Sequence, residues 1–126
     1  MKMEQKFYTC ENCDNIITMI RNAGISAKCC GKEMKEIKPG TTDAATEKHV
    51  PVYKVEGNLV TVNVGSVEHP MQQEHYIEWV FLQSKQGNQW KELRSEGKPE
   101  VCFALCEGDE VEAVYAYCNL HGLWKV

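Results

Sequence analysis

Five residues that commonly bind metal ions are spread over positions 49 to 121. The chain contains four histidines, and the last of them follows a cysteine by three positions; the set is His49, His69, His75, Cys118 and His121. Four imidazoles and a thiolate exceed the four ligands that close a structural zinc site. A nitrogen-rich set with one sulfur suits a redox metal such as iron or copper better. Any one of these histidines alone would be read as a surface or hydrogen-bonded residue, but the Cys-x2-His spacing favours a metal site.

A second group of candidate ligands lies near the other end of the chain. Cys10 and Cys13 are separated by two residues, and the adjacent pair Cys29 and Cys30 follows. Two close pairs of thiolates predict a tetrahedral sulfur site for iron or zinc. Because the second pair is adjacent, the spacing departs from that of a zinc ribbon, and we expect a distorted tetrahedron.

These motifs, in this order, resemble desulfoferrodoxin, the two-iron form of superoxide reductase. The resemblance covers nearly the whole chain and includes the residues around the candidate ligands: Glu47-Lys48-His49-Val50-Pro51, His69-Pro70-Met71, and Cys118-Asn119-Leu120-His121-Gly122. Each motif is weak by itself, whereas their combination within 126 residues is specific.

The resemblance implies two irons per chain and an enzyme that reduces superoxide by one electron to hydrogen peroxide, without oxidising a second superoxide. The first iron would be held by Cys10, Cys13, Cys29 and Cys30. The second would have an axial Cys118 and four equatorial histidines, His49, His69, His75 and His121.

The resemblance also implies catalytic roles for two charged residues beside His49. Glu47 would take the sixth position once the iron is ferric, and Lys48 would lie near the site that is open to substrate. The alternative for both is a solvated charge pair. The expected partners are a rubredoxin-like electron donor and a second copy of the chain in a homodimer.

The overall charge argues against a nucleic-acid partner. The chain has 18 acidic and 14 basic side chains, for a net charge of −4, and no basic stripe that would follow a phosphate backbone. An anionic substrate would therefore need a local cation, and Lys48 is the candidate.

The cysteine count and the first residues predict a cytoplasmic protein. Seven cysteines are an odd number, and the charged start of the chain lacks the apolar run of a signal peptide. Free thiols are typical of a reducing compartment. No apolar run approaches the roughly 18–20 residues that a membrane span requires, so no membrane insertion is expected.

The chain is expected to be all-β, with two domains joined by a linker. Residues 1–36 predict a small metal-centred β module, since a piece of this size rarely folds without a metal, a disulfide or a partner. Residues 37–45 contain a Pro-Gly turn and small polar residues and are expected to be the linker. Residues 46–126 predict an antiparallel β-sandwich. The resemblance implies a desulforedoxin- or rubredoxin-like first domain and an immunoglobulin-like second domain.

The strands of the second domain follow from alternation and turn signals. Val60, Val62 and Val64 alternate with polar or small residues, and Gly57-Asn58 before them predicts a two-residue hairpin turn. Residues 76–82 form an apolar run, which would place His75 on the same face as Ile77, Trp79 and Phe81 if no bulge intervenes. Further turns are expected at 86–88, 96–99 and 107–109.

Cys102 and Cys106 remain outside both groups. On one strand they would share a face at about 13 Å separation, which is too far for a disulfide. We expect both to be buried, inert thiols.

Two other functions are compatible with the candidate ligands. One is an electron-transfer or structural protein with zinc at the four cysteines and a saturated second site. The other is a sensor that binds a diatomic ligand reversibly at an open iron. The fifth ligand and the neighbouring Glu47-Lys48 disfavour the structural alternative, because a structural zinc needs neither.

Overall fold

The computed structural model describes residues 4–126 and divides into two compact units. One unit ends at Lys38 and the other spans Pro39–Val126. Both consist of strands, turns and loops, apart from the four-residue helix α1, Thr46–His49. The predicted all-β class is therefore confirmed. No helix within residues 4–126 is long and apolar enough to cross a membrane.

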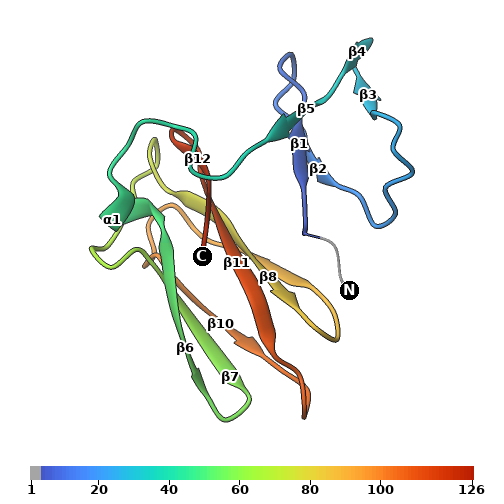
Figure 1. The fold of residues 1–126 in the computed structure, drawn as a ribbon. Helices are drawn as coiled ribbons and strands as arrows, with labels where there is room; N and C mark the ends of the chain where they lie inside the picture. Colours follow the sequence, from blue (N-terminus) through green and yellow to red (C-terminus); the bar gives the residue numbers. More distant parts are fainter. Residues whose placement is uncertain (1–3) are drawn as a thin grey trace. The chain divides into compact units, whose positions relative to one another are not determined.

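The first unit is built from five short strands (Figure 1). Strand β1 (Phe7–Thr9) lies between β2 (Ile16–Thr18) and β5 (Lys35–Ile37) in an antiparallel sheet. Strands β3 (Lys28–Cys29) and β4 (Lys32–Glu33) form a separate hairpin. The four cysteines lie in the turn after β1 and at the end of β3, so two short turns bring them together.

The second unit is a sandwich of two antiparallel sheets. The first sheet has the order β10-β7-β6, with β6 at Pro51–Glu56, β7 at Leu59–Val64 and β10 at Glu100–Ala104. The second has the order β12-β11-β8-β9, with β8 at Ile77–Ser84, β9 at Gln89–Glu92, β11 at Val111–Cys118 and β12 at Gly122–Lys125. Its core joins apolar side chains of both sheets: Val60, Val62, Val64, Phe103, Val80, Leu82, Val114 and Ala116.

The predicted hairpin forms at Gly57-Asn58. Strands β6 and β7 pair from Glu56↔Leu59 outward, which leaves only these two residues in the turn. Gly57 has φ +61°, a left-handed conformation that glycine adopts without the steric cost of a Cβ atom. The alternation predicted for β7 is also present, because its three valines are fully buried.

The predicted face of His75 required that no bulge intervene, and the structure contains one. His75 precedes β8, and the register between β8 and β11 shifts between the pairs Tyr117↔Trp79 and Cys118↔Ile77. Ile77 consequently belongs to the core cluster. The alternation of β8 places Trp79 on the opposite face from Val80, so Ile77 and Trp79 do not share a face.

The prediction for the remaining cysteines also needs correction. Strand β10 ends at Ala104, so Cys106 lies beyond it, and its side chain is exposed. Cys102 lies on β10 and is partly buried. The apolar composition of residues 101–106 suggested one continuous strand, but the last two residues already belong to the loop toward β11.

Three connections meet at one end of the sandwich (Figure 1). They are α1, the long β7–β8 connection and the β11–β12 turn. The four histidines of the second group lie on these connections, and Cys118 is the last residue of β11.

Candidate metal centres

The first candidate centre is a cluster of four thiols. One sulfur from each of Cys10, Cys13, Cys29 and Cys30 lies within 4.8 Å of the others. The Sγ atoms of Cys13 and Cys29 are 3.5 Å apart, and those of Cys29 and Cys30 are 3.9 Å apart. Sulfurs bound at about 2.3 Å to one tetrahedral ion would be about 3.8 Å apart. The cluster therefore fits one iron or zinc ion with no room for substrate among its ligands.

The turns around these thiols explain their convergence. The N–H of Asp14 donates to the carbonyl of Cys10, and the N–H of Cys10 donates to the carbonyl of Asn15, so residues 10–15 form a closed turn. At the other pair, Cys30 has φ +53° and Gly31 has φ +76°. This left-handed corner lets adjacent cysteines both face the cluster.

The thiols also need a cation. The backbone N–H of Cys13 lowers the pKa of Cys10 to about 7. Side-chain hydrogen bonds with Cys10 and Cys13 raise the pKa of Cys29 to about 12, because they favour the protonated form of its thiol. A bound metal ion favours the thiolate form of all four cysteines, because its positive charge offsets much of their negative charge.

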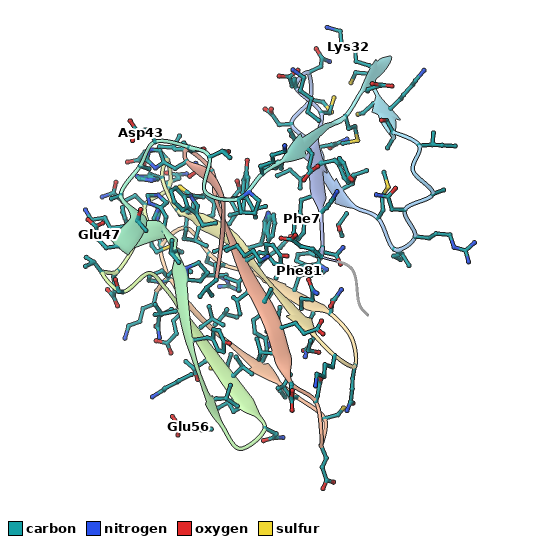
Figure 2. The ribbon with its side chains drawn as sticks, in the orientation of Figure 1. Phe7, Lys32, Asp43, Glu47, Glu56 and Phe81 are labelled. Carbon is teal, nitrogen blue, oxygen red and sulfur yellow. The ribbon has the colours of Figure 1, made fainter. Side chains whose placement is uncertain are left out.

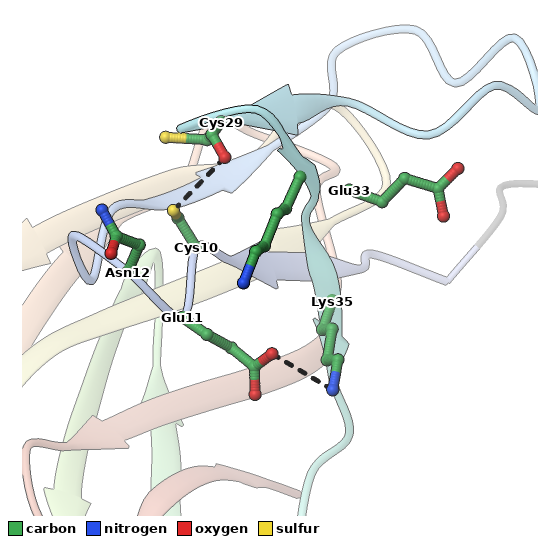
Figure 3. Close-up of a pocket in the computed structure, with 7 residues that line it drawn as sticks. Cys10, Glu11, Asn12, Cys29, Glu33 and Lys35 are labelled. Carbon is green, nitrogen blue, oxygen red and sulfur yellow. Dashed lines mark hydrogen bonds and ion pairs between the residues drawn. The ribbon is translucent and has the colours of Figure 1, made fainter.

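A pocket opens beside the first cluster (Figure 3). It is lined by Cys10 and Cys29 together with polar residues, among which Lys35 and Glu11 form an ion pair of 3.1 Å. Both charged side chains are largely exposed, so this pair contributes little to stability. The cluster thus lies close to the solvent.

The second candidate centre is a closed ring of four imidazoles. The residues follow one another around the ring in the order His49, His69, His75 and His121. The centroids of successive imidazoles are 4.6, 4.7 and 5.1 Å apart, and 4.9 Å separates His121 from His49. Each ring stands nearly perpendicular to the next, with interplanar angles of 79° to 86°. The nitrogen edges therefore converge on one point.

The nitrogen spacing matches a single metal ion. His49 Nε2 is 3.1 Å from His69 Nε2 and 3.1 Å from His121 Nδ1. Two nitrogens bound at right angles to one ion at about 2.1 Å would lie about 3 Å apart. His75 Nε2 is buried without a hydrogen-bond partner, which is the state expected of a ligand atom whose metal supplies its missing interaction.

Cys118 supplies the sulfur of this group. It ends β11, is fully buried, and its Sγ lies 3.9 Å from His121 Nδ1. Burial raises the pKa of the thiol, while the backbone N–H groups of Leu120 and His121 oppose that shift. A cation beside the sulfur would favour the thiolate.

Burial favours the neutral form of His49, His69 and His75, which is the form that metal ligation requires. It lowers the pKa of His69 to about 4, and it also lowers the pKa values of His49 and His75. The positive charge of Lys48 adds to the decrease at His49 and His75. Lys48 therefore acts electrostatically on the ring from its exposed position.

Glu47 is not part of the donor group. Its side chain projects outward from α1 into solvent (Figure 2), and the five atoms that converge belong to the four histidines and Cys118. Its carbonyl oxygen instead accepts hydrogen bonds from the N–H of Val67 and the hydroxyl of Ser66. These bonds tie α1 to the β7–β8 connection.

Two residues that orient the imidazoles of this centre were not predicted from the sequence. Ala45 accepts a hydrogen bond from His49 Nδ1 at 2.7 Å, and Pro70 accepts one from His69 Nδ1 at 2.6 Å. Such bonds fix which ring nitrogen faces the metal. Both acceptors are backbone carbonyls, so no side-chain pattern could have revealed them.

Gly65 permits the close approach of α1 to the end of β7. A Cβ atom at this position would lie 2.7 Å from the carbonyl oxygen of Glu47 and 2.8 Å from that of Val50. Because real Cβ atoms do not come so close to backbone atoms, only glycine fits here. The alternation of β7 marked Gly65 only as a small residue.

Comparison with known proteins gives concordant matches. The family model described as Desulfoferrodoxin matches residues 41–126. Desulfoferrodoxin from Syntrophotalea carbinolica is 42% identical over 99% of this chain and 98% of its own length, and the one from Nitratidesulfovibrio vulgaris is 42% identical over the same shares.

Solved structures show the same likeness. The superoxide reductase from Treponema pallidum superposes with a TM-score of 0.84 at 45% identity, covering 98% of this chain and 99% of that one. The superoxide reductase (1Fe-SOR) from Giardia intestinalis has a TM-score of 0.54 at 34% identity and covers 64% of this chain and 96% of its own.

Proposed function

The chain belongs to the desulfoferrodoxin family, and from this premise we propose that its reaction takes place at the ring of four imidazoles beside Cys118. The protein is a superoxide reductase that carries two irons, one with four cysteine ligands and one with four histidines and one cysteine. When bound at the second site, ferrous iron supplies one electron to superoxide, and two protons complete hydrogen peroxide.

The ligands that we propose for the two irons are the members of the two clusters. Cys10, Cys13, Cys29 and Cys30 would hold the first iron; His49, His69, His75, Cys118 and His121 would hold the second. The observation that carries this assignment is the convergence of each set of donor atoms within 4.8 Å. Accordingly, we propose that residues 1–36 and 46–126 are separate iron domains joined by residues 37–45.

The histidines and the cysteine of the second set differ in role. His49 and His69, whose Nδ1 atoms bond to backbone carbonyls, present Nε2 inward in a fixed orientation. The buried Cys118 thiolate provides the single anionic and polarisable donor. Four neutral imidazoles leave most of the iron charge uncompensated, which favours an anionic substrate.

Lys48 and Glu47 act around this centre. Lys48 contributes a positive charge that attracts superoxide at short range, because the protein as a whole is negative. Glu47 would supply a carboxylate ligand to the oxidised iron. Its exposed position on a four-residue helix leaves the side chain room to change conformation.

The four-cysteine iron stores or relays electrons. Its donor set is saturated, so substrate does not bind there, and the pocket in Figure 3 leaves the cluster near the solvent for exchange with another protein. A rubredoxin-like protein is the proposed donor, and a homodimer is the proposed assembly. The need for free thiols at both sites supports a cytoplasmic location.

The decisive experiment is the stoichiometry of superoxide removal. Pulse-generated superoxide is mixed with the reduced two-iron protein, and hydrogen peroxide and dioxygen are both measured. A reductase yields one hydrogen peroxide for each superoxide consumed and no dioxygen. Release of dioxygen in an amount equal to that of hydrogen peroxide would indicate dismutation. The variant Cys118→Ser should lose the fast reaction, because serine is a harder donor with a much higher pKa.

A further inference from the structure

The four imidazoles are not held in the same way. His49 and His69 donate ring N–H groups to the carbonyls of Ala45 and Pro70. In the part of the chain that the structure describes, the ring of His75 makes no hydrogen bond, and its buried Nε2 is left without a partner. Its position in the set must therefore come from its backbone.

Asn119 holds that backbone on both sides of His75. Its Oδ1 accepts a hydrogen bond of 2.9 Å from the N–H of Tyr76, and its Nδ2 donates one of 3.0 Å to the carbonyl of Glu74. The backbone N–H of Asn119 also donates to the carbonyl of Tyr76 at 3.2 Å. Three bonds from one residue thus bracket a single histidine.

The chemistry of these partners fixes the orientation of the amide. A backbone N–H can only donate and a carbonyl can only accept, so the two ends of the Asn119 side chain cannot be exchanged. Aspartate has no donor for Glu74, and alanine has neither group. The position therefore requires both halves of an amide.

The turn that carries His75 has one further restraint. His75 and Gln72 exchange two backbone hydrogen bonds, of 2.9 and 3.1 Å. These bonds shape the turn but do not tie it to the rest of the site. Asn119, between Cys118 and His121 in sequence, provides the link to the segment that bears two other ligands.

We propose that Asn119 is a positioning residue for the second iron site, which keeps the imidazole of His75 in the four-histidine ring by holding the backbone of Glu74 and Tyr76. This inference rests on the proposed assignment of His75 as an iron ligand. Loss of the amide should free one ligand selectively and leave His49, His69 and Cys118 in place.

The test measures ferrous iron affinity in a Cys13→Ser background, where only the second site contributes. Asn119→Ala should weaken iron binding by about 10- to 100-fold, the usual effect of losing a group that supports a ligand. It should also shift the midpoint potential and the ferric absorption of that site. In the metal-free protein, the amide hydrogen of Tyr76 should exchange faster, since its acceptor is gone.

A double-mutant cycle separates positioning from general destabilisation. In a His75→Ala background, Asn119→Ala should have little further effect on iron affinity, because the ligand it supports is absent. In a His69→Ala background the two effects should add. Asn119→Asp retains the acceptor for Tyr76 and should give a smaller loss, which provides a second variant if Asn119→Ala does not fold.

Equal losses of affinity in the wild-type and His75→Ala backgrounds would overturn the proposal. Unchanged affinity, potential and Tyr76 exchange would overturn it as well. These readouts do not depend on turnover, so a protein that binds iron as expected but fails to reduce superoxide would refute the proposed function and leave the role of Asn119 measurable.

Discussion

The indole of Trp124 lies against the imidazole of His49, with ring centroids 5.0 Å apart and planes inclined by 31°. The same indole donates its Nε1–H to the carbonyl of His121 at 3.0 Å. One buried side chain of β12 thus contacts two of the four histidine residues. Its removal should therefore disturb the iron site and destabilise the fold.

Replacement of Trp124 by leucine should destabilise the second unit by about 2 kcal/mol, because a buried aromatic ring and a hydrogen bond are both lost. Trp124→Phe keeps most of the ring and should cost less. Chemical denaturation of the metal-free protein measures the change, with Trp90→Phe on the exposed surface as control. Equal stability of Trp124→Leu and wild type would contradict this role.

Gly65→Ala should displace the segment that carries His49. The new Cβ would meet two backbone carbonyl oxygens below 3.0 Å, so α1 must move. We expect a loss of iron from the second site with the four-cysteine absorption retained. Gly97→Ala is the matched control, because its nearest neighbour would lie at 3.6 Å. Full second-site iron content in Gly65→Ala would show that α1 adapts without disturbing His49.

Cys13→Ser should remove the optical signature of the first iron and largely spare the second. The two clusters draw their donors from different units, and a serine hydroxyl does not replace a thiolate at neutral pH. Iron content and visible spectra of the oxidised protein check this expectation. Simultaneous loss of both signatures would count against two independent sites.

Lys48→Ile should slow the second-order reaction with superoxide several-fold at low ionic strength, because a nearby positive charge is removed. The difference should shrink toward 0.15 M salt, where the Debye length is about 8 Å. Lys85 directly follows the last residue of β8. Its replacement, Lys85→Ile, changes the net charge of the protein equally and serves as the control. Pulse-generated superoxide decay gives the rates, and identical rates for both variants at low salt would leave Lys48 without a role in guidance.

Glu47→Ala should, unlike Lys48→Ile, maintain or increase the rate of the reaction with superoxide and alter the ferric spectrum.

The metal-free protein should lose stability as the pH falls from 6.5 toward about 4. Burial lowers the pKa of His69 to about 4 in the folded state, compared with an ordinary value of 6.5. Between these values the unfolded chain binds more protons, so the free energy of unfolding decreases with falling pH. Above 6.5 the residue contributes no pH dependence, and below about 4 the loss is complete.

Urea unfolding of the metal-free protein between pH 4 and about 8 tests this window. His69→Gln removes the titrating group, and its stability should depend less on pH than that of the wild type. Parallel pH profiles for the two proteins would show that another group causes the loss, since carboxylates also titrate near the lower limit.

The residue types that could bind metal and the alternation of the strands could be predicted from the sequence, whereas the orientations of the ligand side chains could not. The Cys-x2-His motif and the four histidines indicated the second iron site, and the family matches confirm the predicted resemblance to desulfoferrodoxin. The sequence could not reveal that His121 faces its neighbour through Nδ1 while His49 uses Nε2. That choice depends on backbone geometry at the β11–β12 turn.

Local irregularities explain the wrong predictions. The bulge between Ile77 and Trp79 breaks the alternation that would have placed these two residues on one face. Cys106 was expected in a buried strand, but β10 ends two residues earlier. Both depend on pairing with distant strands, which hydrophobic period alone does not encode. Asn119 could have been noticed, since asparagine often bonds to backbone groups near turns.

The separation of the ligands along the chain has a kinetic consequence. His49 and His121 are 72 positions apart, yet their ring nitrogens lie 3.1 Å from each other. Such a non-local pair forms only after the strands between them have found their partners, which makes it a late event in folding. The four cysteines span only positions 10 to 30 and can meet in a partly folded chain. Iron should therefore enter the four-cysteine site early in folding. Release of iron from the four-histidine site should instead follow the rate at which the sandwich unfolds.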